Sequence, residues 1–265
     1  MTISTTTTYA GLSLEKRGHT AIITLTNPPA HTWTRDSLVA LTKLVRDLEE
    51  DREIYALVIT GAGEKFFSAG AELRLFADGD KAVARTMARR FGEAFETLSS
   101  YRGVSIAAIN GYAMGGGLEC ALACDLRVVE EHAVMALPEA SVGLLPCAGG
   151  TQWLTRTVGE PWAKRMVLLG ERVDASTALH IGLADEMVGR GQALQRALAM
   201  ADSVAKQSPS AVRACKHLIQ GARSTTPQQM LLAERELFID LFDTADQREG
   251  VSAFLEKRAP LWRNG

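Results

Sequence analysis

The chain has 265 residues and a formal net charge of −2, with 46% hydrophobic and 23% charged residues. This balance predicts a globular protein with one substantial core, and the dispersed basic residues exclude the positive stripe that nucleic-acid binding requires. The most apolar stretch, residues 105–125, is interrupted by Asn110, Glu119 and three glycines, so we expect no membrane association.

The cysteines and histidines argue against a disulfide framework and a metal centre. The four cysteines have no C-x-x-C spacing, and Cys120 and Cys124 lie one helical turn apart in an apolar stretch, where free cysteine behaves as a small hydrophobe. No two of the five histidines have metal-ligand spacing, so we expect no metal. The Thr-rich residues 1–10 predict a loose tail without the features of an export signal. We therefore expect a reducing, cytoplasmic location.

Short strands alternate with helices over the first two hundred residues. Residues 12–16 and 20–25 predict a hairpin around Gly18, and Thr34 is placed to cap an amphipathic helix that follows. Further expected strands are 56–60, 105–109, 126–129, 133–137 and 183–188, with a long apolar helical stripe at 83–98.

Two of these strands open segments of the same order: apolar strand, turn, small-residue loop, acidic residue and helix. The first begins at residue 56 and the second at residue 105, an offset of about fifty residues, and a third such unit after 126 is compatible with the pattern. This repetition predicts a stacked spiral over residues 1–200. Residues 201–265 show only helical signals, which we interpret as a lid or an oligomer contact.

The two glycine-containing loops are candidates for an anion site. Each can present one backbone N–H to a shared oxygen, with Ala69 from the first loop and Gly116 from the second as the expected donors of an oxyanion hole. The alternative is that the glycines only allow close packing of helix and strand.

Two glutamates are candidates for acid–base work. Glu119 lies in an otherwise apolar helix, where a charged carboxylate is costly unless it has a partner such as an arginine. Glu139 follows Pro138 and is either a surface turn residue or the second member of a pair. Two carboxylates at one site separate into an acid and a base, and such a pair can move water.

The sequence lacks the motifs of a serine hydrolase, of a phosphate-binding Walker loop and of a dinucleotide-binding site. Phe66 stands where a G-x-S-x-G nucleophile elbow around Ser68 needs glycine, residues 61–65 have the wrong spacing for a Walker loop, and residues 111–117 do not match G-x-G-x-x-G.

Three segments in order resemble the crotonase (enoyl-CoA hydratase/isomerase) family. They are Ser68-Ala69-Gly70-Ala71-Glu72, the segment 110–119 (NGYAMGGGLE), and Pro138-Glu139 followed by Gly149-Gly150-Thr151-Gln152. The resemblance runs from about residue 12 to residue 258.

The resemblance implies an α/β spiral of ββα units with a C-terminal helical region, assembled as a homotrimer or a dimer of trimers. It implies an acyl-CoA thioester substrate, with coenzyme A as part of the substrate and no separate cofactor. Ala69 and Gly116 match the oxyanion-hole amides, Glu119 and Glu139 match the hydratase glutamates, and residues 69–72 match the substrate-binding loop. The expected reaction is hydration of a trans-2-enoyl-CoA.

Three positions depart from the family pattern, and two rival functions stay open. Glu72 replaces a common Asp, His31-Thr32-Trp33 replaces an Asn-Ala-Leu-like segment near the adenine site, and Cys147 replaces a glycine beside the acyl pocket. The rivals are an enoyl-CoA isomerase, which typically keeps only the second glutamate, and a non-catalytic acyl-CoA-binding protein.

Overall fold

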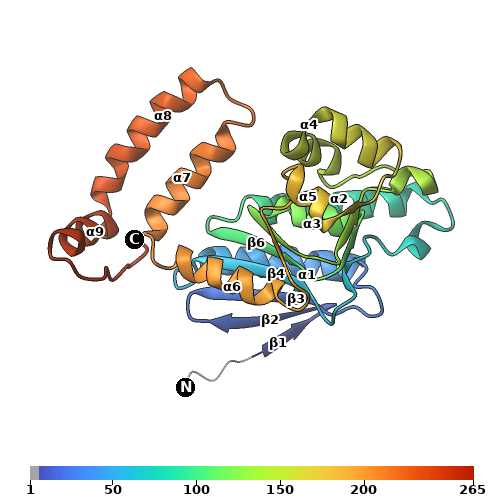
Figure 1. Ribbon diagram of the computed structural model, residues 1–265, viewed down its shortest axis with the longest axis horizontal. Helices are drawn as coiled ribbons and strands as arrows, with labels where there is room; N and C mark the ends of the chain where they lie inside the picture. Colours follow the sequence, from blue (N-terminus) through green and yellow to red (C-terminus); the bar gives the residue numbers. More distant parts are fainter. Residues whose placement is uncertain (1–5) are drawn as a thin grey trace.

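The computed structural model describes residues 6–265, and in it two sheets are stacked with helices around them (Figure 1). The larger sheet has the strand order β1-β2-β3-β4-β6-β8-β11, and the smaller has the order β10-β9-β7-β5. The strands of the larger sheet are β1 (Thr6–Tyr9), β2 (Leu12–Arg17), β3 (Thr20–Leu25), β4 (Ala56–Gly61), β6 (Val104–Ile109), β8 (Leu126–Glu130) and β11 (Glu186–Val188). Those of the smaller sheet are β5 (Phe66–Ser68), β7 (Tyr112–Met114), β9 (Val134–Ala136) and β10 (Val173–Asp174).

The chain alternates between the two sheets, which confirms the predicted spiral. β4 lies in the larger sheet and β5 in the smaller, and the pairs β6/β7 and β8/β9 repeat this step. Successive turns are parallel neighbours, so β4 pairs with β6 and β5 with β7. The loops that follow β5, β7 and β9 therefore lie side by side at one edge of the smaller sheet.

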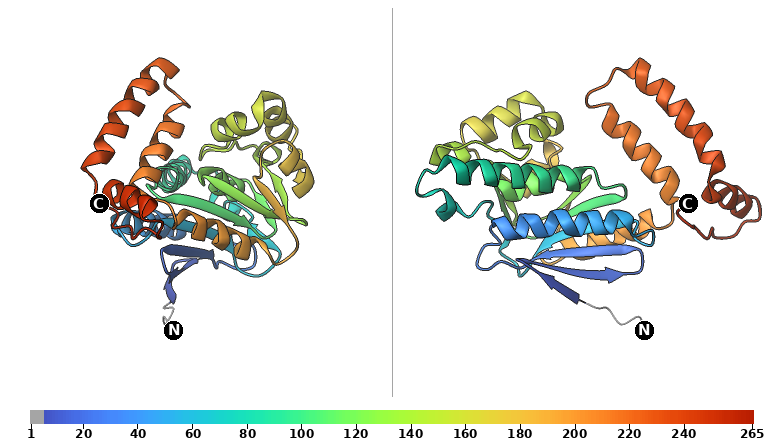
Figure 2. Two further views of the ribbon diagram at one scale, coloured as in Figure 1. Left: turned by 60° about the vertical axis from the view of Figure 1, so that its left-hand side comes forward. Right: turned by 180° about the vertical axis from the view of Figure 1, so that it is seen from behind.

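Helices and short 3-10 turns connect the strands and cover the sheets (Figure 2). Their bounds are α1 (Arg35–Glu50), η1 (Leu73–Phe76), α2 (Lys81–Ser99), α3 (Gly116–Ala123), η2 (Glu139–Val142), α4 (Gly150–Leu168), α5 (Ala175–His180), α6 (Ala193–Val204), α7 (Pro209–Gly221), α8 (Pro227–Asp240), η3 (Leu241–Asp243) and α9 (Ala245–Leu255). The start of α1 is fixed by a capping box in which Thr34 and Ser37 exchange side-chain-to-backbone hydrogen bonds.

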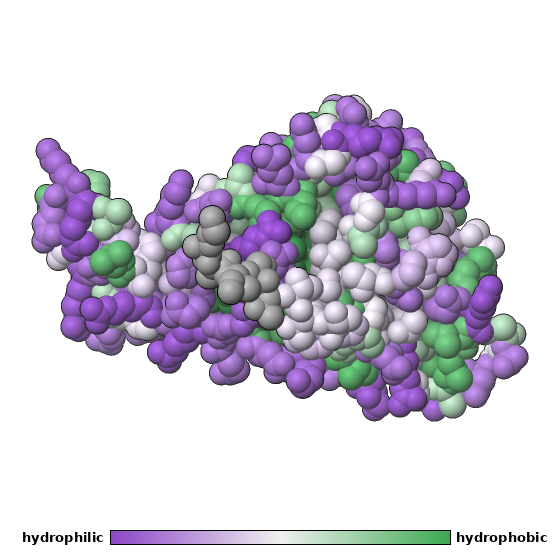
Figure 3. All heavy atoms as spheres, turned by 90° about the horizontal axis from the view of Figure 1, so that it is seen from below, coloured by the Kyte–Doolittle hydropathy of each residue, from purple (hydrophilic) through white to green (hydrophobic). Residues whose placement is uncertain are grey.

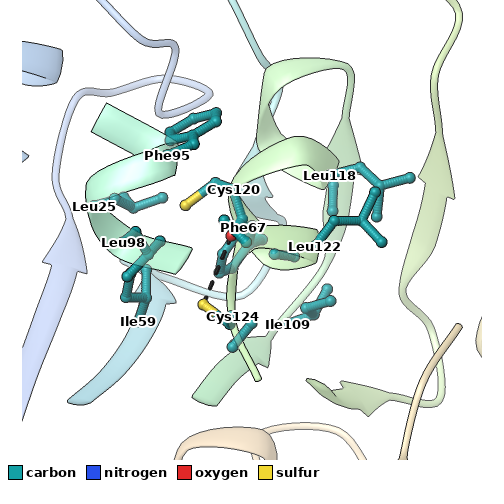
Figure 4. Close-up of a cluster of buried hydrophobic side chains, with 14 of the residues drawn as sticks. Leu25, Ile59, Phe67, Phe95, Leu98, Ile109, Leu118, Cys120, Leu122 and Cys124 are labelled. Carbon is teal, nitrogen blue, oxygen red and sulfur yellow. Dashed lines mark hydrogen bonds between the residues drawn. The ribbon is translucent and has the colours of Figure 1, made fainter. Parts of the chain in front are cut away.

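Helix α3 lies inside the core, and every one of its residues is buried. Cys120 and Cys124 belong to one apolar cluster with Phe67 of β5 and Phe95 of α2 (Figure 4). Both cysteines are free, as the sequence predicts. Because α3 is packed on all sides, its first turn is held in a fixed position relative to β5 and α2.

The last three α-helices form an arm, residues 209–255, that projects from the rest of the molecule (Figures 1 and 2). Lys216 joins α7 to the core, because its Nζ donates to the carbonyl oxygens of Tyr101 (2.6 Å) and Gly103 (2.8 Å) and to Asp125 Oδ2 (2.6 Å). Apolar residues are exposed on the arm among polar ones (Figure 3). They include Ile219, Leu232, Phe238, Ile239, Phe254 and Leu255.

The first described residues of the chain belong to the larger sheet. Residues 6–9 are not a loose tail but form β1, which pairs antiparallel with β2; residues 1–5 of the predicted tail lie outside the described residues.

Within residues 6–265, no helix has the length and apolar character to cross a membrane.

Candidate active site

The loops that follow β5 and β7 touch at Gly70 and Gly116. A Cβ placed on Gly70 would lie 2.7 Å from the Met114 carbonyl oxygen and 3.0 Å from the Gly116 nitrogen. Gly70 also has a φ of +87°, which L side chains adopt with difficulty. Glycine is therefore required at this position for both space and conformation, and it brings the two loops together.

Backbone hydrogen bonds from the segment 30–33 fix the position of the loop that follows β5. The Ala69 N–H donates to the Ala30 carbonyl oxygen (2.9 Å), and the backbone of Trp33 pairs with the Gly70 carbonyl and the Glu72 amide. The positive φ of Gly70 reverses the chain between these contacts.

This arrangement corrects the predicted amide donor. The Ala69 N–H already has an acceptor, so it is not available to a ligand. The Ala71 N–H has no acceptor among residues 6–265, and Ala71 lines the cavity described below. The prediction missed this because the direction of an amide depends on the φ of Gly70 and on a partner segment about forty residues away.

The second amide is that of Gly116, the first residue of α3. Gly115 precedes it with a φ of +52° and supplies no capping side chain, so the Gly116 N–H stays without an acceptor among the described residues. Phe91 of α2 packs against this residue, since a Cβ on Gly116 would lie 2.9 Å from Phe91 Cε1. The start of α3 thus presents a free N–H at the positive end of a helix, which favours negative charge.

Glu119 is 2% exposed and is held by backbone, not by an arginine. Its Oε1 accepts hydrogen bonds from the amides of Ala148 (2.8 Å) and Gly150 (2.9 Å), and the latter begins α4. Burial raises the pKa of Glu119, and the bonds from Gly150 and Ala148 partly offset this by stabilising the carboxylate. The arginine-paired alternative is therefore wrong for this structure.

Glu139 opens η2 and is half-buried beside the same loops. A Cβ on Gly115 would lie 2.9 Å from Glu139 Oε1, and Glu139 Oε2 is buried without a hydrogen-bond partner among the described residues. Burial raises the pKa of Glu139 to about 7, and the negative charge of Glu119 contributes. The two carboxyl groups therefore differ, because Glu119 has amide donors that favour its ionised form whereas Glu139 has an environment that favours its neutral form.

A cavity of about 650 Å³ joins these groups. Its lining contains Ala69, Ala71, Gly116, Glu119 and Glu139, together with apolar residues of η1, α2 and the η2 loop. Two residues whose amides have no acceptor among the described residues, and two unlike carboxyl groups, thus line one cavity. The arrangement can stabilise an oxyanion and transfer protons on either side of it.

The remaining predicted residues have other positions. Glu72 caps η1, and its Oε2 accepts from the Thr32 hydroxyl (3.3 Å), so its side chain does not line the cavity. Trp33 is 1% exposed and packs edge-on against Phe95, which makes it a core residue. Cys147 lines the cavity, and burial followed by the charges of Glu119 and Glu139 raises its pKa to about 11, so the thiol is neutral.

The chain is similar in sequence to known proteins. A family model described as enoyl-CoA hydratase/isomerase matches residues 15–265. A 2,3-dehydroadipyl-CoA hydratase of Escherichia coli K12 is 38% identical over 252 residues, covering 94% of this chain and 97% of that protein. A short-chain-enoyl-CoA hydratase of Clostridium acetobutylicum is 34% identical, covering 92% of this chain and 94% of that protein.

The chain is also similar in sequence and fold to solved structures. Pseudomonas aeruginosa DspI is 66% identical, with a TM-score of 0.94 and coverage of 96% of this chain and 97% of that chain. An enoyl-CoA hydratase of Bacillus anthracis is 31% identical, with a TM-score of 0.93 and coverage of 97% of this chain and 100% of that chain.

Proposed function

The chain belongs to the enoyl-CoA hydratase/isomerase (crotonase) family, and from this premise we propose that it adds water across the trans-2 double bond of an enoyl-CoA thioester. The product is a 3-hydroxyacyl-CoA. The observation that supports hydration is the presence of both Glu119 and Glu139 on one cavity with two free amides. Coenzyme A is part of the substrate, and the proposed reaction needs no other cofactor.

The mechanism assigns one role to each group. The thioester oxygen accepts hydrogen bonds from the Ala71 and Gly116 amides, which stabilise the negative charge that develops on it when C3 is attacked. Ionised Glu119 takes a proton from the attacking water, and neutral Glu139 gives its proton to C2. One water is thereby added, and the two carboxyl groups return to their starting states by proton exchange.

Purified protein is expected to remove the enoyl absorbance of crotonyl-CoA or of a longer trans-2-enoyl-CoA as hydration proceeds. An isomerase would instead convert a 3-enoyl-CoA to its conjugated 2-enoyl isomer, with a gain in absorbance and no hydroxyacyl product. An acyl-CoA-binding protein would bind the thioester without changing it. Mass analysis identifies hydration by the added water, and the gain in absorbance separates isomerisation from binding, because an isomer has the mass of its substrate. Either of the last two outcomes would overturn the proposal.

The pKa of Glu139 gives the proposal a pH signature. Because Glu139 must hold its proton to act as the acid and has a pKa of about 7, kcat/KM is expected to fall tenfold per unit as pH rises above about 7. Steady-state rates between pH 5.5 and 9 measure this. A rate that rises through pH 7 would instead make Glu139 the base and reverse the two roles.

We also propose that the arm assembles copies of this chain into a homotrimer or a dimer of trimers. The exposed apolar side chains of the arm support this, because burying them between copies is favourable. Sedimentation equilibrium checks it, and a monomer at micromolar concentration would contradict it. The free cysteines support a reducing location such as the cytoplasm.

A further inference from the structure

No positively charged side chain of the described residues lines the cavity, either beside the two glutamates or farther along its wall. Among the described residues that line it there is no lysine, arginine or histidine, and its only carboxylates are Glu119 and Glu139. The rest of the wall is mainly aliphatic or aromatic, with Leu73 and Phe76 from η1 and Val142 and Leu144 from the η2 loop. An anionic group in this space would contact apolar side chains and would find no cationic partner among the described lining residues.

Helix α2 forms an apolar wall on one side of the cavity. Phe91 packs beside Gly116 at the reactive end, and Ala88 and Ala84 follow it toward the start of the helix, all three lining the cavity. At 1.5 Å per residue this side extends roughly 10 Å from Phe91 to Ala84. The small side chains at Ala84 and Ala88 leave room for an extended chain along the helix.

Basic residues occur on the same elements but do not line the cavity. Arg74 lies in η1, and Arg85 and Arg89 are the residues that follow Ala84 and Ala88 in α2. Successive helical positions are about 100° apart, so these arginines lie on a different side of α2 from the two alanines. The positive charges of these arginines therefore lie outside the lining of the cavity.

We propose that the acyl tail of the substrate is an uncharged hydrocarbon, and that the enzyme discriminates against acyl chains that end in a carboxylate. This rests on the proposed hydratase function and specifies its substrate class. It sets the chain apart from its relative named 2,3-dehydroadipyl-CoA hydratase, whose named substrate carries a free carboxylate at the end of its acyl chain. The negative charge of ionised Glu119 adds repulsion to the missing partner.

Two six-carbon substrates test the proposal at constant chain length. The protein is assayed with trans-hex-2-enoyl-CoA and with 2,3-dehydroadipyl-CoA, which differ in the terminal carboxylate. We expect kcat/KM to be about tenfold or more higher for hexenoyl-CoA, because the carboxylate would lie against apolar side chains without a cationic partner. Values within threefold of each other would overturn the proposal.

A substitution in the cavity wall provides the matched test. Ala84→Arg places a cation about two helical turns from Phe91, and Ala84→Gln adds comparable bulk without charge. Relative to Ala84→Gln, Ala84→Arg is expected to reduce the preference for hexenoyl-CoA by about tenfold or more. Circular dichroism confirms that both variants fold, and equal preferences in the two folded variants would count against an uncharged tail site.

Binding separates failure of this proposal from failure of the hydratase assignment. Saturated hexanoyl-CoA and adipyl-CoA cannot be hydrated, so calorimetry measures tail preference without turnover. If neither enoyl substrate reacts but hexanoyl-CoA binds at least tenfold more tightly than adipyl-CoA, the hydratase assignment fails and the tail preference stands. Equal affinities would overturn the tail preference whatever the reaction.

Discussion

Glu119→Gln and Glu139→Gln are each expected to lower kcat for hydration by about 10²–10⁴-fold, the usual contribution of a general acid or base. Glutamine keeps the shape of glutamate and can still accept a hydrogen bond, but it cannot take up or release the proton. KM should change little, because the Ala71 and Gly116 amides still bind the thioester. Steady-state kinetics with a trans-2-enoyl-CoA measure both variants.

The pair of variants also distinguishes the rival reaction. In an isomerase that depends on Glu139 alone, Glu119→Gln would leave most of the activity and Glu139→Gln would remove it. Near wild-type hydration by either variant would contradict the assigned roles. As a control, Glu131→Gln changes an exposed carboxylate that does not line the cavity and should leave kcat unchanged.

Glu139→Gln should at the same time stabilise the fold at high pH. The folded-state pKa of about 7 lies above the ordinary value of 4.5, so the folded protein binds this proton more tightly than the unfolded chain. Wild-type stability therefore decreases as pH rises from about 4.5 to 7 and stays lower above it. After allowing for partial solvent exposure, the variant should be more stable than wild type by about 1–2 kcal/mol at pH 8. Urea unfolding at pH 5 and pH 8 measures this, and a difference independent of pH would contradict it.

Gly117→Ala is the second change expected to have a large effect. A Cβ at this position would lie 2.2 Å from the Ser68 carbonyl oxygen and 2.9 Å from the carbonyl carbon, so α3 and the β5 loop must separate. Overpacking of a core typically costs about 1–3 kcal/mol. Because the two free amides belong to these two segments, we expect kcat to fall by about 10²-fold as their spacing changes.

Gly92→Ala is the control for this prediction. Gly92 lies inside α2, and the nearest atom to its added Cβ is the flexible Glu96 Oε1 at 3.4 Å. Alanine at a compatible helical position should raise stability by about 0.5–1 kcal/mol and leave kcat unchanged. Thermal unfolding and kinetics of both variants provide the test. Full activity in Gly117→Ala would show that the spacing of the two amides does not matter.

The sequence predicted what depends on local pattern. Strand–loop–helix repetition indicated the spiral, and a carboxylate in the apolar run 118–124 marked Glu119 as a site residue. The amide donor was misassigned to Ala69, because its partner Ala30 is 39 residues away and the backbone turn at Gly70 is a three-dimensional property. The partners of Glu119 could not be predicted either, since Ala148 and Gly150 follow it by 29 and 31 residues.

The contact between Glu119 and Gly150 links the chemistry to local folding. Helix α4 begins after Gly149, which has no side chain to accept a hydrogen bond from the helix start, and Glu119 Oε1 accepts one from the Gly150 amide from another helix. The proposed base thus also satisfies the first amide of α4, in place of a side chain at the N-cap residue Gly149. A shorter or apolar residue at this position would leave two buried N–H groups without an acceptor and fray the helix start. Selection for a folded α4 therefore favours a hydrogen-bond acceptor of this length independently of selection for catalysis, so a descendant that lost the reaction but kept this helix start would be expected to carry glutamate or glutamine at position 119.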